Sequence, residues 1–89
     1  MLFRSIAMVH DFTLVYALNP ELDSQDEVLR RLAGSDCADA TVGWGRPGHA
    51  ALAFSREAMD CNAAVALAVA QMAQVLPGAS LVRTKAVAP

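Results

Sequence analysis

Residues 40–56, ATVGWGRPGHAALAFSR, decide the fold of this chain, because a glycine-rich segment separates two runs with strand character. Residues 40–44 read as a strand, and residues 45–48 read as the turn that follows it. Residues 50–56 are ambiguous, since their alanines also suit a helix. Leu52 and Phe54 nevertheless alternate with small residues, and the preceding turn favours a hairpin, so we interpret this run as a strand.

The segments on both sides of this hairpin complete an α/β pattern. Phe12, Leu14 and Tyr16 alternate with smaller residues and predict a first strand that Asn19-Pro20 ends. The capping-box pattern from Ser24 to Glu27 begins a helix over residues 24–33. Asp60 caps a second helix over residues 61–76, Pro77-Gly78 stops it, and residues 79–84 form the last strand.

The predicted order is therefore β-α-β-β-α-β, that of a ferredoxin-like α+β sandwich. Such a domain has a four-stranded antiparallel sheet with both helices on one face. We expect one domain over residues 11–85, a loosely ordered N-terminal extension over 1–10 and a tail over 86–89. The pattern begins just after Met8, which suggests Met8 as an alternative start.

Composition limits the possible partners. Hydrophobic residues make up 55% and charged residues 18% of the 89 residues, so some apolar surface should stay exposed and favour a homo-oligomer, most simply a dimer, or a protein partner. The net charge of −2 argues against nucleic-acid binding. No apolar run is long enough for a signal peptide or a bilayer span, and two lone cysteines suit reduced thiols, so we expect a cytoplasmic protein without membrane contact.

The sheet face away from the helices is the first candidate site. If the large apolar residues of the first and third strands face the helices, small residues cover the other face. We predict that this open face is an interface, formed by Thr13, Val15, Ala17, Ala51, Ala53 and Ser55.

The glycine-rich loop is the second candidate site. Gly43 to Gly48 matches the pattern GxGxxG, which binds a pyrophosphate only when a helix follows it in a parallel βαβ unit. Here a strand is expected to follow, so a hairpin turn is the preferred interpretation. An anion or another small ligand remains an alternative use of the loop, through Gly43, Trp44, Gly45, Arg46 and His49.

Catalytic and metal chemistry find little support in the sequence. Cys37 lies between acids that would raise the pKa of its thiol, and we interpret it as buried and inert; the alternative is a nucleophile that His49 approaches. His10 and Asp11 are adjacent in a strand and should point to opposite faces, so they make a poor catalytic pair. The two Cys and two His have no metal-ligand spacing, so we expect no catalytic site, metal or cofactor.

Several short motifs resemble a known group of proteins. They are Asp11-Phe12-Thr13-Leu14, residues 39–43 with Gly45, Pro47 and Gly48, Leu52-Ala53-Phe54, Arg56-Glu57-Ala58 and Pro77-Gly78-Ala79. Together they resemble the N-terminal domain of uncharacterised bacterial proteins that often carry a C-terminal helix-turn-helix segment. The resemblance implies a sensing or pairing module attached to a DNA reader. No helix-turn-helix lies within residues 1–89, so the resemblance assigns DNA binding to none of these residues.

Overall fold

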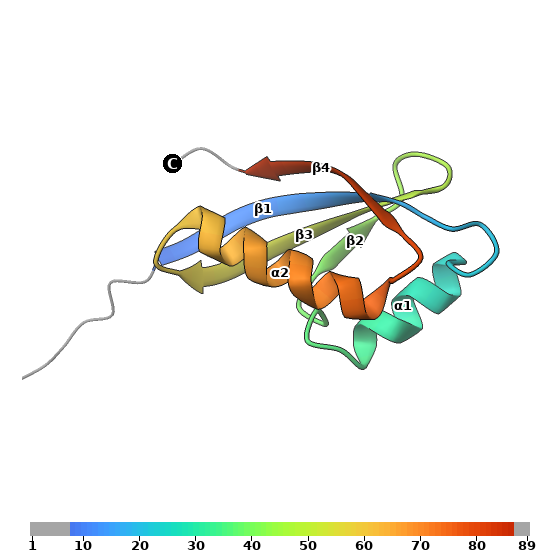
Figure 1. Ribbon diagram of the computed structural model, residues 1–89, viewed down its shortest axis with the longest axis horizontal. Coiled ribbons are helices and arrows are strands. Elements are labelled where there is room, and N and C mark those ends of the chain that lie inside the picture. Colours follow the sequence, from blue (N-terminus) through green and yellow to red (C-terminus); the bar gives the residue numbers. More distant parts are fainter. Residues whose placement is uncertain (1–7, 87–89) are drawn as a thin grey trace, which may run out of the picture.

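The computed structural model describes residues 8–86, which form four strands and two helices. In chain order these are β1 (Met8–Ala17), α1 (Gln25–Ala33), β2 (Thr41–Gly43), β3 (His49–Ala58), α2 (Cys61–Val75) and β4 (Ser80–Ala86). The strands make one antiparallel sheet in the order β2-β3-β1-β4, and α2 lies in front of its central strands in Figure 1. The chain therefore belongs to the α+β class, and residues 50–56 are in a strand.

The two central strands of the sheet, β1 and β3, carry the core. Phe12 pairs with Phe54 and Leu14 with Leu52, and the two phenyl rings stack with their centroids 5.3 Å apart. These four side chains are nearly inaccessible to solvent. Both helices add to the same core from one side of the sheet, through residues Val28, Leu32, Ala64, Ala68, Met72 and Val75. The predicted alternation of these two strands is confirmed.

Side-chain caps fix where each helix begins. The Ser24 hydroxyl accepts a hydrogen bond from the Glu27 amide at 3.2 Å, and an Asp60 carboxylate oxygen accepts one from the Ala63 amide at 2.7 Å. Each cap satisfies a backbone donor that the first helical turn leaves without a partner. Both predicted helix starts are confirmed.

The strands extend beyond the expected limits of the domain, residues 11–85, at both ends. β1 begins at Met8, so residues 8–10 are not part of a loose extension: they pair with Ala58, Glu57 and Arg56 because β3 is long enough to reach them. At the other end Ala86 belongs to β4 and pairs with Phe12. Residues 1–7 and 87–89, where the rest of the predicted extension and tail fall, lie outside the described residues.

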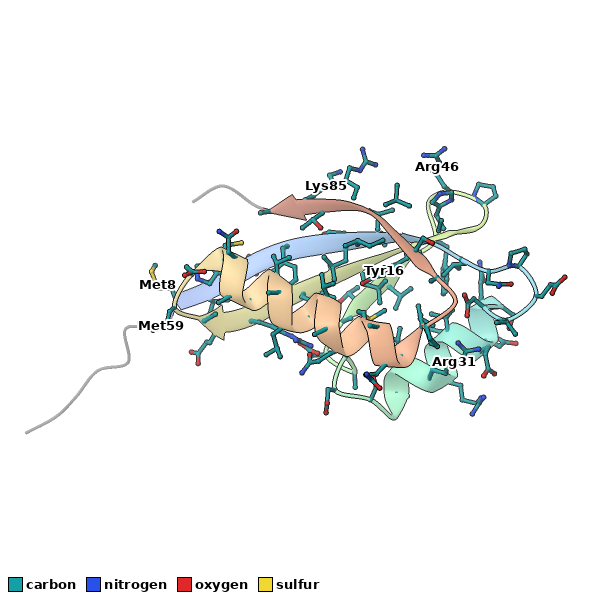
Figure 2. The ribbon with its side chains drawn as sticks, in the orientation of Figure 1. Met8, Tyr16, Arg31, Arg46, Met59 and Lys85 are labelled. Carbon is teal, nitrogen blue, oxygen red and sulfur yellow. The ribbon has the colours of Figure 1, made fainter. Side chains whose placement is uncertain are left out.

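The described surface includes apolar side chains, as composition predicted. Met8 is 66% exposed and Met59 is 61% exposed, and they lie side by side where β1 begins and β3 ends (Figure 2). In the described part of the chain, no helix has both the length and the apolar character needed to cross a membrane.

Candidate functional site

The open face of the sheet is the face opposite the helices, and its residues follow from the register. Its centre holds Thr13 beside Ala53 and Val15 beside Ala51. β4 adds Lys85 opposite Thr13 and Arg83 opposite Val15. Acidic residues occupy one end of this face, where the Ser55 hydroxyl donates a hydrogen bond to Asp11 and where Glu57 follows along β3. The centre is thus small and weakly polar, with acidic residues toward one end and with Lys85 and Arg83 beside it on β4.

The six residues predicted as an interface all lie on this open face. Thr13, Val15, Ala17 and Ala51 are half-buried, because the neighbouring strands shield them. Ala53 and Ser55 are exposed. No helix of the described chain covers them, since both helices pack on the other face.

The glycine-rich loop is a hairpin turn. The His49 amide donates to the Arg46 carbonyl at 3.1 Å, which closes a four-residue turn with Pro47 second and Gly48 third. Gly48 has a φ of 73°, the left-handed conformation that this position of a type II turn requires. β3 follows at once, so the helix that a dinucleotide-binding loop needs is absent from this position. The preferred interpretation as a turn is confirmed.

One groove on the open face joins this turn to β4. It has a volume of about 320 Å³, and its lining residues are Thr13, Val15, Gly45, Arg46, His49, Ala51, Arg83 and Lys85. Of the predicted ligand residues it brings together Gly45, Arg46 and His49. Trp44 packs half-buried against the core and lines a second groove beside the start of α1, where Gly45, Arg46 and His49 also contribute. Gly43 pairs with Ala51 and lines neither groove.

Sequence reasoning missed Arg83 and Lys85. Arg83 lies in the predicted last strand and Lys85 just beyond it. Two residues apart in a strand, they share one face of the sheet, but the sequence does not show whether this is the helix face or the open face. A β-bulge between Val15 and Tyr16 in the β1–β4 ladder decides it. Leu81 pairs with Tyr16 on the helix side, Val82 is the extra residue, and Arg83 then faces the open side.

Cys37 and His49 are not brought together. Cys37 is fully buried in the core, on the helix side of the sheet, whereas His49 lines the groove on the open side. Burial is the main cause that raises the pKa of the Cys37 thiol; Asp39 and Asp36 add to it, and Arg56 opposes it. The thiol is therefore protonated at neutral pH, as predicted for an inert cysteine. Cys37 and Cys61 are both free.

His10 and Asp11 also point apart: a ring nitrogen of His10 lies 3.2 Å from the Ala58 carbonyl, whereas Asp11 bonds to Ser55 on the open face. Within residues 8–86, no three His, Cys, Asp or Glu side chains are grouped so as to hold a metal ion.

Comparisons of the chain with protein-family models, with curated proteins and with solved structures gave no match. The resemblance to the N-terminal domain of helix-turn-helix proteins therefore stays a prediction.

Proposed function

We propose that this chain is a non-enzymatic, cytoplasmic pairing module of the ferredoxin-like class, in which a second copy covers the open sheet face. The element order and the strand order β2-β3-β1-β4 support the class. Two free cysteines support a reducing compartment. The resemblance to bacterial regulators would make such a module the pairing part of a regulator.

One observation carries the proposal: the uncovered face has a small-residue centre, an acidic end, and basic residues that extend from Lys85 beside the centre to Arg46 at the opposite end. Side chains as small as Ala51 and Ala53 let another sheet approach closely, at about 10 Å. A two-fold axis that lies in the plane of the interface, perpendicular to the strands, reverses the strand direction of the second copy. Its acidic residues, Asp11 and Glu57, then approach the basic end of the first copy, so charge complementarity favours this partner.

The size of the face sets the expected affinity. β1 and β3 have ten residues each, which gives strands of about 33 Å, and four strands span about 15 Å. Each copy would then contribute roughly 500 Å², so the pair buries about 1,000 Å², at the low end for specific interfaces. We therefore expect a weak dimer whose population depends on protein concentration.

The test is native mass spectrometry together with sedimentation over a range of concentrations. Ala53→Arg places a long charged side chain at the centre of the face, at an exposed position where we expect little effect on folding. Its matched control is Ala66→Arg, the same change at an exposed alanine of α2. We expect a dimer for the wild-type chain and the control and a monomer for Ala53→Arg. A monomeric wild-type chain, or a dimer that survives Ala53→Arg, would overturn the proposal.

A further inference from the structure

The basic side chains of this acidic chain are distributed unevenly. The described residues hold six Lys and Arg. Arg30, Arg31 and Arg56 each form a salt bridge with a neighbouring carboxylate. The other three make no salt bridge within residues 8–86, and all of them line the open-face groove: Arg46, Arg83 and Lys85.

Two separate parts of the fold bring these cations together. Arg46 opens the turn before β3, whereas Arg83 and Lys85 come from β4, nearly forty residues later. Figure 2 shows Arg46 and Lys85 on the same side of the molecule. The bulge opposite Val15 and Tyr16 turns the two β4 side chains toward the groove, since strict alternation from Leu81 would place Arg83 on the helix side.

Among the residues that line the groove, Arg46, Arg83 and Lys85 bring only positive charge. No Asp or Glu is among its lining residues, and His49 adds a ring whose Nδ1 lies 3.0 Å from the Pro47 carbonyl, within hydrogen-bond distance. The acids of the same face, Asp11 and Glu57, lie beyond Thr13, toward the start of β1 and the end of β3, and do not line the groove. Like charges held in one groove repel one another, and an anion placed between them removes that repulsion.

Edge protection alone does not account for this arrangement. Charged residues on an edge strand such as β4 discourage edge-to-edge pairing with other chains. This role explains why Arg83 and Lys85 are charged, but not why they share a groove with other basic residues. That role requires neither Arg46 nor His49, which lie on the far side of β1 from β4. The groove also has a defined floor, made of Val15, Ala51 and Thr13.

We propose that this groove binds a small oxyanion, a phosphate or carboxylate group, whose less polar part lies over Val15 and Ala51. Arginine donates two parallel hydrogen bonds to such a group, and lysine adds a point charge. The site is formed by a single copy of the chain, so it does not depend on pairing. An oxyanion ligand differs in kind from the second copy of the pairing proposal.

The test is a titration of ¹⁵N-labelled full-length chain, followed by amide chemical shifts, with inorganic phosphate in one arm and succinate in the other. Sodium chloride at matched ionic strength is the control for screening. We expect saturable shifts at Thr13, Val15, Gly45 and Ala51 with at least one of the two anions, and the stronger response identifies the preferred group. Shifts that do not saturate, or that sodium chloride reproduces, would overturn the proposal.

Variants localise the site. Arg83→Gln should weaken anion binding at least tenfold, as expected for the loss of a charge-assisted hydrogen bond. The matched control is Arg30→Gln, an arginine of α1 whose side chain is 72% exposed and far from the groove, and it should bind as the wild type does. Equal weakening in both variants would reject the groove. A chain that binds phosphate but is monomeric even without added anion would reject only the pairing proposal, and a dimer without saturable binding would reject only this one.

Discussion

Arg56 holds the carboxylate of Asp39 with two hydrogen bonds, from Nε at 3.0 Å and from Nη2 at 2.9 Å. The same guanidinium donates to the Asp36 carbonyl at 3.0 Å and to the Gln71 side chain, and it lies 4.6 Å from the centre of the Phe54 ring. One side chain thus ties the loop after α1 to β3 and to α2. Its side chain is only 13% exposed, whereas that of Asp39 is 45% exposed, so water screens the ion pair in part.

Replacing Arg56 should therefore destabilise the fold. Arg56→Gln loses the two-bond contact with Asp39 and the cation over the Phe54 ring, and we expect a loss of about 2 kcal/mol in the free energy of unfolding. Urea denaturation followed by circular dichroism measures it. Arg30→Gln, which removes an exposed pair on one helix, should leave stability nearly unchanged. Equal effects of the two changes would show that Arg56 does not act as a tie.

Stability should depend on pH through the same pair. The Arg56 hydrogen bonds hold the pKa of Asp39 below its usual value. A carboxyl whose pKa is lower in the folded state stabilises the fold above its unfolded pKa, about 3.9, and this contribution is lost as pH falls through the folded value. The stability difference between wild type and Asp39→Asn should thus be larger at neutral pH than near pH 3. An identical difference at both pH values would contradict the pair's role.

The turn before β3 gives a second test of the fold. Gly48→Ala forces an alanine into the left-handed conformation, which should cost about 1 kcal/mol. Gly45→Ala, just before this turn in the same loop, is the matched control, because its φ is not positive and a Cβ there meets no atom within 4 Å. Its stability should be unchanged or slightly higher, since alanine restricts the unfolded chain. Thermal melts compare the two, and similar losses would refute the turn assignment.

The fold was predictable because its signals are local. The alternation of Phe12, Leu14 and Tyr16 fixes which face of β1 is buried, and Ser24 and Asp60 mark helix starts within one turn of the bonds they make. The start of β1 at Met8 was not predictable, because it depends on the length of its partner strand rather than on a pattern of its own.

The site was predictable only in part, for a related reason. Arg46 and His49 stand out within a short glycine-rich loop, so local sequence finds them. Arg83 and Lys85 join them through the pairing of β4 with β1, and the bulge beside Val15 reverses the face that alternation from Leu81 implies. Neither long-range register nor a bulge leaves a reliable mark in one sequence.

The two proposals together predict that anions oppose pairing. In the proposed pair, the acidic end of one copy approaches the cations of the other, including Arg83, so a bound anion and a second copy compete for the same charges. If each copy must release one anion to pair, each contributes a factor of about two when the free phosphate concentration equals the dissociation constant for phosphate. The apparent dissociation constant of the dimer then rises about fourfold.

Sedimentation of the wild-type chain in phosphate and in sodium chloride at equal ionic strength measures this competition. Arg83→Gln should remove most of the phosphate-specific effect, because its groove binds the anion weakly. Phosphate that strengthens the dimer would mean that the anion bridges two copies rather than displacing one of them.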